Sequence, residues 1–96
     1  MKYFDWDNQK NKRLKTERDI SFEDCLVAIN EGKLLATIDH TDKKKYPHQK
    51  IFIINISNYV YLVPFVEDEE KIFLKTIIPS RKFTKKYILK IKDPGK

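Results

Sequence analysis

The chain has 96 residues, 41% of them hydrophobic and 35% charged, and its 20 lysines and arginines against 14 aspartates and glutamates give a net charge of +6. This length and composition predict a single globular domain over residues 1–96 and exclude a second core. A basic surface suits a polyanionic partner such as nucleic acid, although charge also serves solubility alone.

Cysteine content and hydropathy favour a cytoplasmic protein. Cys25 is the only cysteine, which excludes an internal disulfide and a paired-cysteine metal motif and is typical of a reducing compartment. The first ten residues lack the apolar core of a signal peptide, and no run approaches the ~20 apolar residues of a membrane span. We therefore expect no membrane association.

The chain is predicted to begin with a short strand and a polar helix. Residues 2–6 favour a strand, after which Asp7 can cap a helix over residues 8–17 by accepting hydrogen bonds from its free N–H groups. Leu14 is nearly the only aliphatic residue of this helix, so the helix belongs at the surface. It carries cations toward solvent or a partner, among them Lys10, Arg13 and Arg18.

A second helix is predicted over residues 22–31. Residues 21–24 form a capping-box pattern at its start, and Gly32 provides a left-handed residue to end it. Apolar residues recur inside it with helical period, and Ile20 before the cap can pack on Cys25. Cys25 is therefore expected to be a core residue rather than a nucleophile.

The middle of the chain predicts strands. Residues 34–39 favour one, and a polar loop that holds both histidines and several lysines follows over residues 40–50. Pro64 cannot donate a ladder hydrogen bond, so we expect a bulge or a free edge near it. Three apolar runs with short connections predict an antiparallel β-meander, over residues 51–56, 59–66 and 71–78.

The end of the chain predicts a last helix that carries positive charge. Ser80 can cap it, and an apolar stripe can pack on the sheet, formed by Phe83, Tyr87, Ile88 and Ile91. The whole pattern predicts an α+β fold, with an antiparallel sheet of three to four strands, two N-terminal helices and one C-terminal helix. From Lys75 onward no acidic residue occurs before Asp93, so this segment is the one that most favours a polyanion.

Three short motifs follow one another along most of the chain. They are Phe4-Asp5-Trp6-Asp7 with Lys10-Asn11, then Ile20-Ser21-Phe22-Glu23-Asp24, then Ile77-Ile78-Pro79-Ser80-Arg81-Lys82 with Thr84 and Tyr87. In order and spacing they resemble the BrnT family of bacterial toxins, which are small ribonucleases of the RelE-like superfamily. The resemblance implies a RelE-like domain, an RNA substrate and a DNA-binding antitoxin of the ribbon-helix-helix type, and we expect no cofactor.

Two departures from the family pattern bear on activity. Family members commonly carry Lys-His-Gly just before the second motif, where this chain has Glu17-Arg18-Asp19. Arg18 can supply charge at that place but cannot shuttle protons near neutral pH. Residues 38–65 also differ from the family pattern, so the activity can differ as well.

RNA cleavage without a metal needs a base for the ribose 2′-OH, cations for the phosphorane and an acid for the leaving oxygen. Arg81, at a helix start whose N–H groups attract anions, is the predicted phosphate-binding residue, because a guanidinium can hold two oxygens. Lys82 and Lys75 would add charge, and the resemblance implies a role for Tyr87. His48, kept neutral by neighbouring lysines, is a candidate base. Further RNA-binding residues are predicted in the basic segments: Lys10, Arg13, Arg18, Lys43, Lys44, Lys45, Lys85 and Lys86.

Structural roles compete with these assignments. Arg81 can pair with Glu67 or Asp68 at a hairpin end, and Tyr87 falls on the apolar stripe, where its ring can pack at the edge of the core. The lysines of the last helix can be ordinary solvated residues. No metal site is predicted, because no recognised ligand spacing relates Asp39, His40, Asp42 and His48.

The leading hypothesis is a ribonuclease toxin of a type II toxin–antitoxin pair, which would inhibit translation and growth. The alternative is a non-catalytic RNA-, DNA- or protein-binding module on a degenerate toxin fold, favoured by the missing family histidine. A third reading is a structural subunit that contacts an acidic partner.

Overall fold

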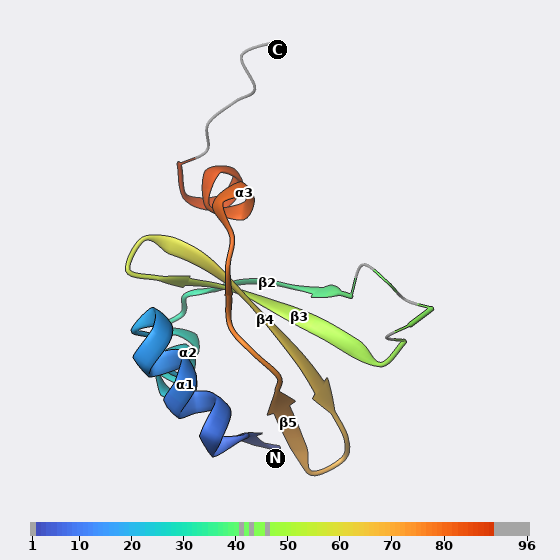
Figure 1. Ribbon diagram of the computed structural model, residues 1–96. Coiled ribbons are helices and arrows are strands. Elements are labelled where there is room, and N and C mark those ends of the chain that lie inside the picture. Colours follow the sequence, from blue (N-terminus) through green and yellow to red (C-terminus); the bar gives the residue numbers. More distant parts are fainter. Residues whose placement is uncertain (1, 41, 43, 46, 90–96) are drawn as a thin grey trace.

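The computed structural model describes residues 2–40, 42, 44–45 and 47–89. The predicted α+β class is confirmed, and helices α1 and α2 lie together on one side of a sheet (Figure 1). The elements in chain order are β1 (Tyr3–Trp6), α1 (Asn8–Arg18), α2 (Phe22–Asn30), β2 (Leu34–Asp39), β3 (Gln49–Ile56), β4 (Tyr59–Glu67), β5 (Lys71–Leu74), β6 (Ile78–Pro79), α3 (Arg81–Thr84) and the π-helix η1 (Lys85–Leu89).

The strands in the described part of the chain form one six-stranded mixed sheet. Its order is β1-β5-β4-β3-β2, and β6 also pairs with β4. β1 runs parallel to β5, and the other pairs are antiparallel. The prediction of a purely antiparallel sheet of three to four strands is therefore wrong in strand number and in direction. Short connections reveal only strands that are neighbours in sequence, whereas β1 pairs with a strand near the other end of the chain.

Pro64 marks the place where the last predicted strand, over residues 71–78, divides into β5 and β6. β5 pairs with residues 65–67 of β4, and β6 pairs with residues 61–62, so neither ladder includes Pro64. The Pro64 carbonyl accepts a hydrogen bond from the backbone N–H of Lys75 at 2.8 Å. The N–H and C=O groups of a strand residue point to the same side of the strand. The N–H that proline lacks would therefore point into the gap between β5 and β6, where no ladder bond needs it. β4 has β3 on one side and both β5 and β6 on the other, so the expected bulge or free edge near Pro64 is wrong. The proline instead falls in the gap between two ladders, and the β3–β4 pairing passes it without a bulge.

Side-chain caps start both N-terminal helices where they were predicted. Asp7 accepts hydrogen bonds from two backbone N–H groups of the first turn of α1, at 2.8 and 3.2 Å. Ser21 and Asp24 form the predicted capping box, in which each side chain accepts a hydrogen bond from the backbone N–H of the other residue. Gly32 follows α2 with a φ of +77°, the left-handed conformation expected of it.

Asn11 fastens α1 to the start of α2. Its side-chain oxygen accepts a hydrogen bond from the backbone N–H of Phe22 at 2.7 Å, and its amide donates to the Glu23 carboxylate at 2.7 Å. The first contact satisfies one of the N–H groups that a helix start leaves free. The second is the main reason why the pKa of Glu23 lies below its ordinary value of 4.5.

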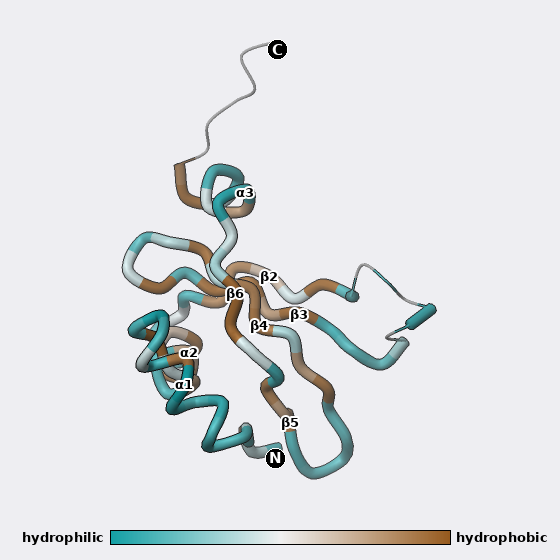
Figure 2. The backbone as a smooth tube through the Cα atoms, in the orientation of Figure 1, coloured by the Kyte–Doolittle hydropathy of each residue, from teal (hydrophilic) through white to brown (hydrophobic). Residues whose placement is uncertain are grey.

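The main core lies between the helix pair and one face of the sheet. Figure 2 shows that hydrophilic residues dominate α1, whereas hydrophobic residues gather in the central strands. Cys25 is fully buried here, and burial raises the pKa of its thiol to about 12, which fits the predicted core role. We call this set the helix-side core: Leu14, Ile20, Phe22, Cys25, Ala28, Phe52, Ile54, Val63, Phe65, Leu74 and Ile77.

The opposite face of the sheet is apolar as well. Ile53 and Val60 are fully buried but lie outside the helix-side core. The register aligns Ile53 with Leu62 and Leu62 with Ile78, so these three side chains share that second face. Ile78 is 42% exposed, and α3 and η1 contact β4 beside it. We call this second face the open face, because α1 and α2 do not cover it.

The C-terminal helix begins as predicted but changes type after one turn. Ser80 caps it, α3 ends at Thr84, and the chain continues as the π-helix η1. Phe83, Tyr87 and Ile88 are partly buried, as the apolar stripe predicted, whereas Ile91 lies outside the described residues. None of the helices in the described ranges is long and apolar enough to cross a membrane.

Candidate functional site

Arg81, the predicted phosphate-binding residue, stands on a helix start that hydrogen bonds fix to the sheet. The Ser80 side chain accepts a hydrogen bond from the backbone N–H of Phe83 at 3.2 Å, and the Ser80 N–H donates to the carbonyl of Val60 at 2.9 Å. The buried Thr84 hydroxyl donates to the Ser80 carbonyl at 2.7 Å and accepts from the N–H of Val60 at 2.8 Å. The backbone that carries Arg81 is therefore held at both ends of its single α turn.

The side chain of Arg81 is exposed, and within the described residues it makes no ion pair. Glu67 and Asp68, the acidic residues that could pair with Arg81, contact other groups. Glu67 pairs with Lys2 at 2.7 Å, and the Asp68 carboxylate accepts hydrogen bonds from the backbone N–H groups of Glu70 and Lys71. The alternative in which Arg81 pairs with Glu67 or Asp68 is therefore wrong. Lys82 and Lys85 next to Arg81 are exposed as well.

A second group of charge and rings lies farther along the same helix. Lys86 Nζ lies 5.9 Å from the ring centre of Phe83 and 5.5 Å from that of Tyr87, and the two rings are 6.0 Å apart. Tyr87 is partly buried, in line with its place on the apolar stripe. We call these three residues the helix cluster.

A third group lies on β5 and the residue that follows it. Lys71 and Lys75 place their Nζ atoms 5.8 and 5.6 Å from the ring centre of Phe73. We call these three residues the sheet cluster. Only Lys75 was predicted as a site residue, because the run over residues 71–78 was treated as an apolar strand. The signal that could have revealed the other two is the alternation Lys-Ile-Phe-Leu-Lys, which puts both lysines and the phenylalanine on one face of a strand.

Arg18 contributes to structure. Its guanidinium donates a hydrogen bond to the carbonyl of Ile77 at 2.8 Å, and Ile77 is fully buried just before β6. The end of α1 is thereby tied to the crossover that leads to Arg81. Asp19, which follows Arg18, has a φ of +54°, a left-handed conformation that glycine adopts more easily.

His48 does not lie beside Arg81. His48 is exposed and directly precedes Gln49, which pairs with Val66 at one end of β4, whereas Ser80 bonds to Val60 near the other end. Six residues of strand separate these two levels, about 20 Å at 3.4 Å per residue. The structure therefore does not bring the candidate base to the candidate phosphate-binding residue.

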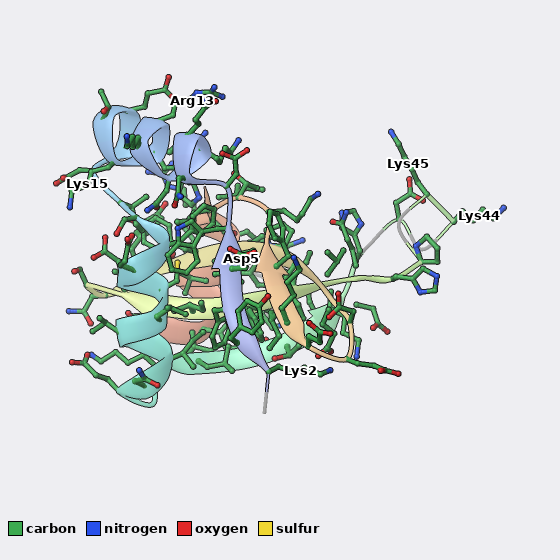
Figure 3. The ribbon with its side chains drawn as sticks, turned by 90° about the horizontal axis from the view of Figure 1, so that it is seen from below. Lys2, Asp5, Arg13, Lys15, Lys44 and Lys45 are labelled. Carbon is green, nitrogen blue, oxygen red and sulfur yellow. The ribbon has the colours of Figure 1, made fainter. Side chains whose placement is uncertain are left out.

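The other predicted RNA-binding residues are spread over the surface. Figure 3 shows Arg13 on the outer side of α1, and Lys44 and Lys45 at the tip of the loop between β2 and β3. Lys10 is partly buried in the first turns of α1. Lys43 lies outside the described residues. These cations come from two separate places, α1 and the β2–β3 loop, whereas the C-terminal candidates lie within residues 75–87: Lys75, Arg81, Lys82, Lys85, Lys86 and Tyr87.

Metal-binding geometry is not found in the part of the chain that the structure describes, where no three His, Cys, Asp or Glu side chains converge. His40 accepts a hydrogen bond from the backbone N–H of Asp42 through Nδ1, at 3.1 Å. Searches of family models, characterised proteins and solved structures find no match to this chain. The resemblance to BrnT toxins therefore rests on the sequence motifs.

Two shallow hollows mark the surface away from Arg81. One, of about 310 Å³, lies between α2 and the end of β3, with Asp24, Glu31 and Lys33 at its rim. The other, of about 430 Å³, lies at the β4–β5 turn and is lined by Tyr3, Asp68, Glu69, Glu70 and Lys71. Carboxylates outnumber cations on both rims, so neither hollow is itself a basic cleft. The basic side chains Arg81, Lys82, Lys85 and Lys86 are exposed, as expected for contacts to an extended backbone rather than to an enclosed small molecule.

Proposed function

We propose that this chain binds RNA through its C-terminal basic segment, Lys71–Leu89, and acts as a metal-independent endoribonuclease toxin of a type II toxin–antitoxin pair. The observation that carries the proposal is the exposed Arg81, which has no acidic partner among the described residues and sits on a helix start fixed by Ser80 and Thr84. A guanidinium held ready in this way can grip two phosphate oxygens without first breaking an ion pair.

The neighbouring residues support such a role. Lys82 and Lys85 are exposed next to Arg81, and Lys86 lies over two aromatic rings, so phosphate and base contacts can be made by one short helix. Lys75, the member of the sheet cluster nearest to Arg81 in sequence, adds a further exposed charge. Tyr87, for which the resemblance implies a role, is a candidate acid for the leaving oxygen, because its ring is only partly buried.

Cleavage is tested with Arg81→Ala and a matched control, Lys12→Ala. Lys12 is exposed on α1, outside the segment Lys71–Leu89, so its loss removes the same charge from another place. Induced expression of the wild type in bacteria should arrest growth, and the purified protein should cut RNA in the presence of EDTA. Arg81→Ala should lower cleavage by about 100-fold or more, as loss of a transition-state charge contact does, and Lys12→Ala should not. Intact RNA with the wild-type protein would refute the enzymatic part of the proposal.

A second function is favoured by the separation of His48 from Arg81. The described residues place no histidine beside the candidate phosphate-binding residue, which suits a non-catalytic RNA-binding module on a toxin-like fold. Such a module would bind RNA with strong salt dependence and leave it uncut. Its affinity would fall by small amounts for several single lysine substitutions, whereas an enzyme loses activity sharply at one residue.

We also propose a cytoplasmic location, from the cysteine content and hydropathy, and an antitoxin partner, which the resemblance implies. A ribbon-helix-helix antitoxin would inhibit by covering the basic segment with acidic and apolar side chains. The antitoxin should be encoded by a reading frame next to that of this chain. The test is whether the two proteins co-purify and whether the complex leaves RNA uncut. Arg81→Glu should weaken that complex.

A further inference from the structure

The sheet cluster lies on the open face of the sheet, away from α1 and α2. Ile72 and Leu74 pack in or against the helix-side core. Because side chains alternate along a strand, Lys71, Phe73 and Lys75 point to the other face. None of these three residues is needed to build the core between helices and sheet.

The neighbouring strand adds a second ring to this face. Phe4 and Trp6 of β1 pack against the helix-side core, so Tyr3 and Asp5 point to the open face. The parallel register pairs Tyr3 with Lys71 and Asp5 with Phe73. Tyr3 is 54% exposed. One strand spacing and two residues of rise separate the Cα atoms of Tyr3 and Phe73, about 8 Å.

We infer that Tyr3 and Phe73 form a stacking platform for two successive bases of single-stranded RNA, with Lys71 and Lys75 holding the flanking phosphates. Aromatic rings on an exposed sheet face stack unpaired bases, and each ring accepts any base because every base has a π-face. This inference rests on the proposed function and names its substrate class. Duplex RNA keeps its base faces covered, so the platform selects unpaired RNA.

Charge complementarity argues for a nucleic acid rather than a protein on this face. The two lysines flank Phe73 within 6 Å of its ring centre, on flexible stems that can turn from the ring to a phosphate as a base arrives. Phosphates on both sides of a stacked base are the groups that such an arrangement matches. Asp68, Glu69 and Glu70 share a hollow with Tyr3 and Lys71 and repel phosphate at that end of the platform. The strand should therefore run from Phe73 toward Lys75 and Arg81.

The distance from the platform to Arg81 matches the length of one short RNA segment. The backbone of β4 from Val66, the partner of Phe73, to Val60, the partner of Ser80, spans about 20 Å. A strand that stacks on the platform and reaches Arg81 therefore needs several nucleotides, within the ~4–16 that single-strand-binding folds cover.

Substitution of Asp5 tests the inference, because the platform predicts a gain in RNA affinity that a purely structural role of these residues does not. Its carboxylate lies 3.6 Å from Lys71 Nζ and faces the platform, where it competes with phosphate for that lysine. Asp5→Asn should therefore raise RNA affinity, by about two- to fivefold at low salt, because it frees Lys71 and removes a repelling charge.

The test is fluorescence anisotropy with a labelled 12-nucleotide single strand and the matching 12-base-pair duplex. Phe73→Leu and Tyr3→Leu keep an apolar side chain and remove a ring, and each should weaken single-strand binding by about tenfold, as loss of one stacked base does. Neither should change binding of the duplex. Tyr59→Leu is the control, since Tyr59 packs on Tyr61 elsewhere in the sheet. Thermal unfolding of each variant confirms that the fold persists.

The outcomes separate this inference from the proposed function. Binding that depends on Arg81 but not on either ring overturns the platform and leaves the proposed function standing. A wild-type protein that binds no RNA overturns both. A dimer in sedimentation that Phe73→Leu dissolves would assign the open face to a second copy of the chain, and would also overturn the inference.

Discussion

Removal of one buried hydroxyl should destabilise the protein measurably. The substitution Thr84→Val keeps the shape of the side chain, which is 5% exposed, and deletes the oxygen that accepts the Val60 N–H at 2.8 Å. That N–H points away from β3, and Val60 is fully buried, so neither a strand nor water replaces the lost acceptor. The Ser80 carbonyl keeps its bond from the Thr84 backbone N–H at 3.0 Å. The cost is therefore that of one unsatisfied buried donor, about 1–3 kcal/mol.

The assay is urea and thermal unfolding followed by circular dichroism. A loss of about 2 kcal/mol should lower the thermal midpoint by roughly 10 °C in a domain of this size. Hydrogen exchange at the Val60 amide should accelerate as its partner disappears. Thr37→Val on β2 is the control, because Thr37 is exposed and such changes usually stay within ~0.5 kcal/mol. A Thr84→Val protein as stable as the control would refute the reasoning that this hydroxyl fixes α3 to β4.

Two further predictions concern α1 and its contacts. Asp19→Gly should stabilise the protein by about 1 kcal/mol in urea unfolding, because Asp19 has a φ of +54° and places an anion at a helix C-terminus. Asp19→Asn removes only the charge and should give a smaller gain. A loss of stability with glycine would contradict this account. Glu23, whose pKa the Asn11 hydrogen bond lowers, contributes stability that is present above pH 4.5 and is lost as pH falls through its folded pKa. Asn11→Ala should return the NMR titration midpoint of Glu23 toward 4.5, and an unchanged midpoint would contradict the assigned cause.

Local chemistry made parts of this fold predictable. The caps at Asp7, Ser21 and Ser80 join groups two or three residues apart, so the sequence alone specified them. The surface position of α1 was predictable by the same local logic, because Leu14 is nearly its only aliphatic residue and is its one buried residue. Pro64 indicated a disturbance in the strand pairing, because a missing N–H is a property of the residue itself.

Contacts between distant segments were not predictable in the same way. The parallel pairing of β1 with β5 has no local signal, and without it the open-face position of Tyr3 beside Lys71 cannot be derived. The bond from Arg18 to Ile77 likewise joins the end of α1 to the β5–β6 crossover. At the candidate site, sequence reasoning selected Arg81 and Lys75 by charge, but it did not find Phe73 and could not place His48 at the far end of β4.

The pairing of β1 with β5 also sets the order of events during synthesis. β1 leaves the ribosome first, yet its only described partner strand emerges after most of the chain has been made. Closing a loop of that length is slow, and until it closes the edge of β5 stays exposed to other chains. Tyr3 on β1 and Phe73 on β5 are brought to neighbouring positions only when these two strands pair. A nascent or truncated chain would therefore lack the platform, so competence to bind single-stranded RNA would appear only when the whole domain has folded.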